Sequence, residues 1–367
     1  MERQARLSAL SRNGNGVKPT MTRLTRAEMK GKAQTVLGLI DPAELGSTLM
    51  HEHLIWNIVP PSKRAEIPQG TVDPHSWWGL LNNTVSDLRN SVQRDRSVAA
   101  RATAEMVAQG GQTVVELTIG GLEPDPEGLA LVARETGAHI VMGCGHYVHD
   151  YQDPANHDRS VDSFAKEMVD QVQQGAWGTD IRAGIVGEIG CQWPWTDLEK
   201  RVLAGAVVAQ QETGGALTIH PARHEDQPWM LVEFLRQEGA DMSRTIIDHI
   251  DRTIFDDDRL FRLADAGVIL EWDLFGQEVT YYGHSDIDMP NDGARIKAIR
   301  RTIDRGYGAQ IVISHDICHT VQMSEHGGHG YAHIHRTVLP RMLQRGFSQA
   351  EVNQIMVENP RRLLTFV

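Results

Sequence analysis

The chain has 367 residues, 41% of them hydrophobic and 23% charged, which is the composition of an ordinary globular protein with enough length for a large core. Its 36 Lys and Arg stand against 48 Asp and Glu, and the net charge of −12 argues against nucleic acid and anionic membranes as partners. No apolar run is long enough to span a bilayer, and three cysteines without CxxC spacing indicate no disulfide framework, so we expect a cytoplasmic protein.

The first 33 residues differ in composition from the rest of the chain. They are rich in Arg and Lys, nearly free of acidic residues, and lack the continuous apolar core of a secretory signal. A transit-like segment and an alternative start at Met21 are two interpretations. The pattern favours a mobile or loosely docked N-terminal extension over residues 1–33, followed by one catalytic domain over 34–367.

From residue 34 onward, eight short apolar runs alternate with amphipathic stretches. The predicted strands are 48–54, 113–119, 139–144, 183–189, 216–220, 245–249, 268–272 and 310–315. The predicted helices are 97–109, 126–136, 161–174, 198–212, 230–238, 257–266, 294–305 and 337–345. Continuous apolar strands, each followed by a helix, predict a parallel sheet covered on both faces, and eight such units predict a closed (β/α)8 TIM barrel.

An open doubly wound sheet is the alternative fold. It would place a glycine-rich phosphate loop after the first strand, where His51-Glu52-His53 stands instead. Two segments, 56–87 and 316–330, are longer than ordinary barrel loops. They could form a lid over a substrate or simply cap the rim of the barrel, and the sequence leaves both roles open.

Polar side chains end five of the predicted strands. They are His51 and His53 on the first strand, Glu188 on the fourth, His220 on the fifth, His249 on the sixth and Asp316 on the eighth. Such residues at the end of an apolar strand require a partner, and in a barrel these ends open onto one face, where active sites lie. We therefore predict a binuclear metal centre there. His51, His53 and Asp316 would bind one metal, His220 and His249 the other, and Glu188 would bridge the two.

The chemistry of this ligand set is that of a hydrolase. Imidazoles and carboxylates suit zinc, manganese or iron, and we expect two divalent ions per subunit, with zinc preferred. Two metals about 3.5–4 Å apart can hold a shared hydroxide and polarise a substrate oxygen, so no Ser or Cys nucleophile is needed. Asp316 could accept the proton of the hydroxide and deliver it to the leaving group.

Two other polar residues each allow two interpretations. Tyr147, just past the third strand, could hydrogen-bond the hydroxide or the substrate, or be an ordinary rim tyrosine. Arg223 could bind the anionic tail of a substrate. A salt bridge from Arg223 to a nearby acid is the alternative that the sequence favours, and the candidate partners are Glu225, Asp226 and Asp251.

Two further groups of residues have simpler expected roles. Asp248 and Asp251, on either side of His249, are expected to orient its ring. The three cysteines lie near strand ends but are expected to pack as small apolar residues rather than to bind metal; they are Cys144, Cys191 and Cys318.

Several stretches together resemble the phosphotriesterase-related proteins of the amidohydrolase superfamily. They include STLMHEHL, AGIVGEIGCQWPWT, IDHIDRTIFD, SHDICHT and ENPRRLLTFV. The resemblance covers residues 31–367 and implies a metal-dependent (β/α)8 barrel with a binuclear centre. It also implies that the family's ligands correspond to the six residues named above.

Two departures from the wider family narrow the implied activity. Glu188 stands where phosphotriesterases and lactonases carry a carboxylated lysine, and Leu274 stands where the lactonase branch tends to have an arginine. Animal members of the matching branch are similar to N-acetyltaurine hydrolases. The resemblance thus implies hydrolysis of a small amide or ester, most simply an N-acyl amino-acid-like amide. A promiscuous phosphotriesterase or lactonase, and a binding protein without turnover, are the alternatives, and a homodimer is a further expectation.

Overall fold

Eight of the apolar runs form parallel strands in the computed structural model, which describes residues 22–279 and 282–367. They are β3 (Thr48–Glu52), β6 (Thr113–Glu116), β7 (His139–Met142), β8 (Val186–Gly190), β9 (Leu217–His220), β10 (Thr245–Ile247), β11 (Ile269–Trp272) and β12 (Ile311–Ile313). Hydrogen bonds order them as β3-β6-β7 and as β8-β9-β10-β11-β12. The eight strands expected from the sequence are confirmed.

Backbone hydrogen bonds across two seams join these two sheets into a barrel. At one seam the amide of Gly184 donates to the carbonyl of Met142 over 2.8 Å, and Gly187 donates to Cys144 over 2.7 Å. At the other, Asp316 donates to His51 over 3.1 Å. The closed barrel is therefore confirmed and the open doubly wound sheet is excluded.

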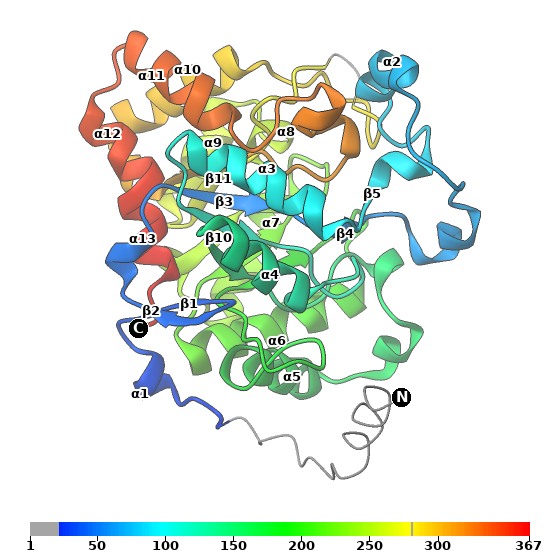
Figure 1. Ribbon diagram of the computed structural model, residues 1–367. Coiled ribbons are helices and arrows are strands. Elements are labelled where there is room, and N and C mark those ends of the chain that lie inside the picture. The colour runs from blue at the N-terminus through cyan, green and yellow to red at the C-terminus, as the bar shows by residue number, and fades with distance from the viewer. Residues whose placement is uncertain (1–21, 280–281) are drawn as a thin grey trace, which may run out of the picture.

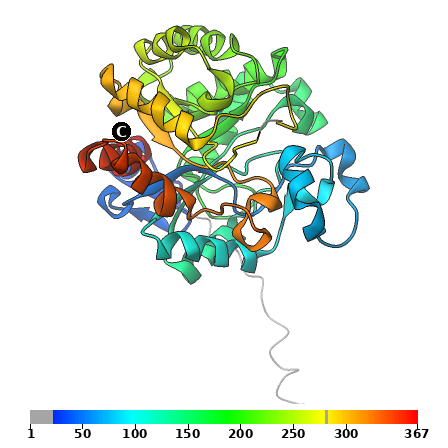
Figure 2. The ribbon, with the colours of Figure 1, turned by 90° about the horizontal axis from the view of Figure 1, so that it is seen from above.

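Helices surround the strands, as Figures 1 and 2 show. They include α3 (Arg96–Ala108), α4 (Pro126–Thr136), α5 (Val161–Gln173), α6 (Asp197–Thr213), α7 (Gln227–Glu238), α9 (Asp257–Asp265), α10 (Asp292–Asp304) and α11 (Leu339–Gln344). Most begin at a side-chain cap, such as Asp95 before α3 and Ser160 before α5. The sequence did not predict the C-terminal helices α12 (Gln349–Asn353) and α13 (Asn359–Leu364).

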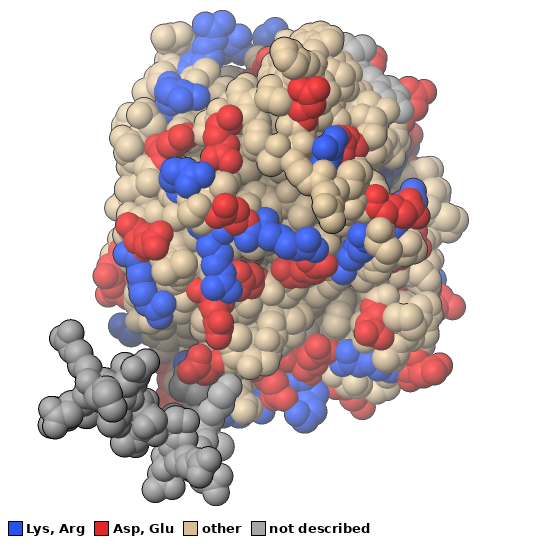
Figure 3. Space-filling view, turned by 45° about the vertical axis from the view of Figure 1, so that its right-hand side comes forward, with Lys and Arg blue, Asp and Glu red and all other residues tan. Residues whose placement is uncertain are grey.

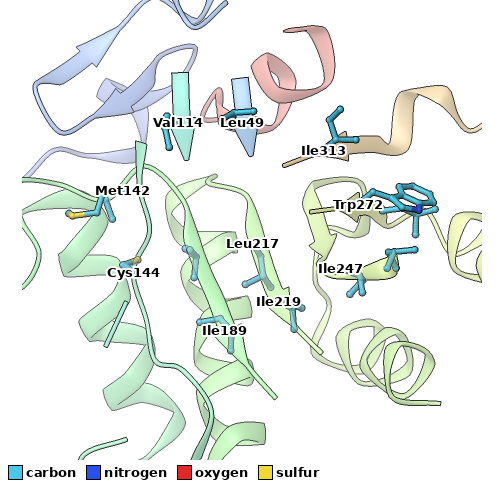
Figure 4. Close-up of a cluster of buried hydrophobic side chains, with 14 of the residues drawn as sticks. Leu49, Val114, Met142, Cys144, Ile189, Leu217, Ile219, Ile247, Trp272 and Ile313 are labelled. Carbon is cyan, nitrogen blue, oxygen red and sulfur yellow. The ribbon is translucent and has the colours of Figure 1, made fainter. Parts of the chain in front are cut away.

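Side chains alternate between the two faces of each strand, and the two faces differ in polarity. The outward face packs against the helices and is mostly apolar; Figure 4 shows members such as Leu49, Val114 and Ile219. The inward face is apolar only near the start of each strand, where Ile269 belongs to a second cluster with residues of the other strands. Two residues further along, the inward position of β11 is Glu271. The barrel interior therefore changes from apolar to polar towards the strand C-termini.

The N-terminal segment covers the opposite end of the barrel. Strands β1 (Ala33–Thr35) and β2 (Gly38–Ile40) form a hairpin, preceded by the short helix α1 (Arg26–Met29). The backbones of Gly31 and Lys32 pair with Phe366 of the C-terminus over 2.8 and 2.9 Å. In the predicted extension, residues 22–33 are thus docked on the barrel, whereas 1–21 lie outside the described residues.

The two long segments pack against each other at the rim. The first includes β4 (Trp56–Asn57), which pairs with β5 (Val92–Gln93), and the helix α2 (Trp77–Asn82). Val72 and Leu80 of this segment form a small apolar cluster with Val321 of the other. In Figure 1, α2, β4 and β5 lie on the side towards which the arrow of β3 points. A lid function for these segments stays a prediction.

The surface and the helices also bear on the expected partners. Figure 3 shows acidic and basic side chains interspersed on one face, without a continuous basic area. Within residues 22–279 and 282–367, helices long and apolar enough to cross a membrane are not found.

Candidate metal centre

The six predicted ligands converge around the carboxylate of Glu188. The Nε2 atoms of His51 and His53 lie 3.5 and 3.4 Å from its two oxygens. On the other side, His220 Nδ1 lies 2.8 Å and His249 Nε2 3.6 Å from Oε2. Asp316 completes the cluster, with Oδ1 3.2 Å from His53 Nε2 and 3.8 Å from His51 Nε2.

The spacings around His51 and His53 fit a bound metal. Two ligand atoms on one tetrahedral zinc, each about 2.1 Å from the ion, lie roughly 3.4 Å apart. The distances from these two rings to the carboxylates are 3.2–3.8 Å, whereas His220 Nδ1 lies at a hydrogen-bond distance of 2.8 Å from both Glu188 Oε2 and His249 Nε2. His51 is fully buried, and neither of its ring nitrogens makes a hydrogen bond within the described residues. Because a buried imidazole without partners is costly, the donor set fits a divalent cation.

The electrostatics of the cluster also favour positive charge. Burial by itself raises the pKa of Glu188, but His51 and the neighbouring imidazoles outweigh burial and hold this pKa well below its ordinary value. Burial opposes protonation of His53, yet Asp316 and Glu188 raise its pKa to about 10. Burial also opposes protonation of His51, but Glu188 and Asp273 raise its pKa well above the ordinary value, whereas burial and the neighbouring His249 hold the pKa of His220 well below it. The carboxylates therefore favour positive charge on the His51 and His53 side, where a divalent ion could take the place of these protons.

Two of the six residues hold a strained backbone. His249 and Asp316 have φ angles of +54° and +50°, in the left-handed region that non-glycine residues rarely adopt. Such strain costs on the order of 1–3 kcal/mol per residue and persists where the surrounding structure enforces it, often at functional sites. Here it turns the side chains of both residues towards the cluster just after their strands end.

A buried carboxylate that the sequence analysis did not assign orients His249. Asp273 Oδ1 lies 2.8 Å from His249 Nδ1, and its Oδ2 accepts the backbone N–H of His249 over 2.9 Å. The expectation that Asp248 and Asp251 would orient this ring is therefore wrong. Asp248 accepts from Thr218 over 2.5 Å, and Asp251 binds the guanidinium of Arg295 over 2.6 Å. The two acids next to His249 in sequence are therefore engaged with other partners, and the ring is oriented from the end of β11 instead.

A further buried carboxylate, that of Glu271, lies beneath the cluster. Glu271 is fully buried, and neither of its oxygens has a hydrogen-bond partner among the described residues. Burial, with the charges of Asp248 and Asp273, raises the pKa of Glu271 well above its ordinary value. The shift favours the protonated form of Glu271, because a second full charge beside Asp273 would be unfavourable.

A second hydrogen-bonded pair, His315 and Glu52, connects the segment after the last strand to the first strand. His315 Nδ1 lies 2.6 Å from Glu52 Oε1, and Glu52 also accepts the backbone N–H groups of His315 and Ile317. The other ring nitrogen of His315 accepts from the backbone of Ile334 over 3.1 Å. His315 therefore bonds at both nitrogens and fixes the segment that carries Asp316.

A cavity of about 550 Å³ opens above the cluster, and both predicted substrate residues line it with His53, Glu188, His220 and Asp316. The hydroxyl of Tyr147 lies 3.3 Å from His220 Nδ1. Burial raises the pKa of Tyr147 well above its ordinary value, so this residue stays a neutral phenol.

The alternative of a salt bridge for Arg223 is wrong. Its guanidinium donates to the hydroxyl of Tyr282 over 3.2 Å, and its Nε is buried without a partner among the described residues. The expected acids are engaged elsewhere: Glu225 and Asp226 pair with Arg259, and Asp251 pairs with Arg295. Arg223 thus presents an uncompensated positive charge to the cavity.

The three cysteines pack as expected. Cys144 and Cys191 are buried, Cys318 is partly buried, and all three are free thiols. Burial raises the pKa of each one, so thiolates are not available to bind a cation.

Comparison with known proteins agrees with this site. The model of the phosphotriesterase family matches residues 31–364. A Bos taurus protein named N-acetyltaurine hydrolase is 38% identical over 348 residues, covering 93% of this chain and 99% of the relative.

Two solved structures have the same architecture. A resiniferatoxin-binding protein from Rhodobacter sphaeroides has a TM-score of 0.87 at 31% identity, covering 93% of this chain and 97% of that one. The phosphotriesterase homology protein from Escherichia coli, solved with phosphate in its active site, has a TM-score of 0.73 at 28% identity, covering 89% and 100%. The resemblance inferred from the sequence is confirmed across the whole barrel.

Proposed function

This chain belongs to the phosphotriesterase family of metal-dependent hydrolases, and we propose that it hydrolyses an N-acyl derivative of an anionic amine, with N-acetyltaurine as the reference substrate. The relatives named N-acetyltaurine hydrolase match it from end to end. One observation carries the proposal beyond family membership. The unpaired guanidinium of Arg223 lines the same cavity as the Glu188 cluster, so the cavity offers an anion subsite beside a cation site.

Glu188 and the five residues around it are proposed to hold two divalent ions, with zinc as the first candidate. When bound, such ions lower the pKa of water and polarise an amide carbonyl, which supplies the nucleophile and the electrophile of hydrolysis. Glu188 would supply its own carboxylate as the ligand shared by the two ions, so no carbon dioxide would be needed to form the site.

The chain's own residues would divide the remaining work. Asp316, at the edge of the cluster, would take up the proton released on attack and deliver it to the departing amine. Tyr147, a neutral phenol beside His220, would donate a hydrogen bond to the carbonyl oxygen of the amide as negative charge develops there. Arg223 would hold the sulfonate or carboxylate of the amine, which fixes the amide over the cluster.

Two finer expectations accompany the proposal. Three free thiols, two of them buried, are compatible with the cytoplasm as the location of the protein. We also propose that the protein forms a homodimer, and light scattering would test this assembly.

The test is a hydrolysis panel on protein purified without chelator. We expect release of taurine from N-acetyltaurine, much slower hydrolysis of a neutral N-alkylacetamide, and weak activity on lactones and phosphotriesters. A matched Arg223→Lys variant should retain part of the preference for the anionic amide, because it retains the charge but loses the guanidinium fork. Hydrolysis of lactones or phosphotriesters well above that of every N-acyl amide would reject the proposal.

A further inference from the structure

The cavity above the metal centre is larger than the reference substrate requires. N-acetyltaurine has about ten non-hydrogen atoms, which at roughly 20 Å³ each fill on the order of 200 Å³. The cavity measures about 550 Å³ and is within the range of sites that enclose much larger ligands. Space therefore remains after the amide and its anionic tail are placed.

The residues that line this cavity fall into two groups by chemistry. Arg223, Tyr282 and His284 form a polar group, from the loops after β9 and β11. Burial holds the pKa of His284 well below its ordinary value, so Arg223 supplies the positive charge of this group.

A second group of lining residues is apolar and forms the apolar patch; it consists of Ile58, Pro60, Leu122, Val148 and Tyr151. Its members come from three loops that follow β4, β6 and β7. The backbone of Asn57 bonds to the carbonyl of Leu122 over 3.0 Å, and the hydroxyl of Tyr151 donates to the carbonyl of Ile58 over 2.9 Å. These bonds hold the patch together as a preformed surface.

We infer that the apolar patch is a subsite for the acyl group and that the preferred substrates carry an acyl chain longer than acetyl, of about six carbons. This inference rests on the proposed function. With the anionic tail held at Arg223 and the amide over Glu188, the acyl group is the part of the substrate left to contact the rest of the cavity lining. The apolar patch is the part of that lining suited to an alkyl chain, and an acetyl group supplies only a single methyl group to it.

A chain-length series of N-acyl taurines tests the inference. Full burial of one methylene is worth about fourfold in binding, and on a partly open wall about twofold is expected. The value of kcat/KM should therefore rise about tenfold from acetyl to hexanoyl. A maximum at acetyl with a steady fall for longer chains would overturn the subsite while leaving the proposed function intact. A lack of hydrolysis across the whole series would reject both.

Polar variants locate the effect on the patch. Val148→Thr exchanges one methyl group for a hydroxyl with little change in volume, and Ile58→Thr introduces a hydroxyl and also shortens the side chain by one carbon. Each should lower the hexanoyl-to-acetyl ratio of kcat/KM about threefold. Val85→Thr, at a half-exposed valine that does not line the cavity, is the matched control and should leave the ratio unchanged. An equal ratio in all three variants and the parent would overturn the assignment to this patch.

Discussion

The floor of the cavity and its rim are built from different parts of the chain and follow different rules. The floor consists of side chains at the ends of buried strands. Further buried carboxylates hydrogen-bond to this region, such as Asp273 to His249 and Glu52 to His315. The rim consists of loop residues such as Arg223 and Ile58 that have few partners. Under the proposed function, the floor would determine whether hydrolysis occurs and the rim would determine which amide reacts.

The largest effect is expected at Asp316, which is proposed both to bind metal and to transfer a proton. Asp316→Asn should lower amide turnover by about 10²–10⁴-fold, because an amide cannot carry a proton to the departing amine. A nitrophenyl ester, whose leaving group needs no proton, should lose less. Turnover of both substrates has to be measured at known metal occupancy. Equal losses at full occupancy would show that Asp316 is a ligand only and that the proton travels by another group.

Glu188→Gln tests whether Glu188 bridges two divalent ions. The amide carries no charge to hold two cations, so the variant should lose one metal and more than about 100-fold in turnover while the barrel stays folded. Metal analysis and circular dichroism of one preparation check both points. Activity of the parent should also be independent of added bicarbonate. A variant with two metals and normal rates would mean that the bridge is misplaced.

Asp273→Asn tests the carboxylate that orients His249. Loss of the partner that orients His249 is expected to weaken metal binding and turnover by about 10–100-fold. Asp251→Asn is the comparison, because its carboxylate neutralises the buried Arg295 instead. That variant should mainly lower the midpoint of thermal unfolding. The reverse pattern, with metal affinity sensitive to Asp251 and not to Asp273, would refute the assignment.

The smallest effect is expected at the rim. Arg223→Gln should raise KM for N-acetyltaurine about tenfold with little change in kcat, because one charge-assisted contact to the tail is lost. A neutral amide should be hardly affected. Arg259→Gln is the matched control, since that guanidinium pairs with acids at the surface. The same rise in KM for charged and neutral amides would argue against an anion subsite at Arg223.

The floor was predictable from the sequence because burial and periodicity act locally. A continuous apolar run marks each strand, and a His or an acid at its end is conspicuous. Asp273 was missed although it follows the same alternation, with Ile269, Glu271 and Asp273 on the inward face. The left-handed φ of His249, which turns the ring towards Asp273, leaves no signature in composition.

The rim was less predictable because its contacts depend on distant segments. The acids near Arg223 pair with Arg259, more than 30 residues away in the sequence, so proximity along the chain was misleading. The helices after residue 348 were also missed. Their packing against the barrel wall, through Ile355 and Leu363, is visible only once the barrel has closed.

The most direct test of the account is a metal titration of the chelator-treated protein, with taurine release from N-acetyltaurine measured at each addition. The account predicts negligible activity without metal, a rise with added zinc that levels off at two equivalents per chain, and no response of Glu188→Gln over the same range. Full activity of the metal-free protein would contradict the central claim that the cluster around Glu188 is a metal-dependent hydrolytic centre.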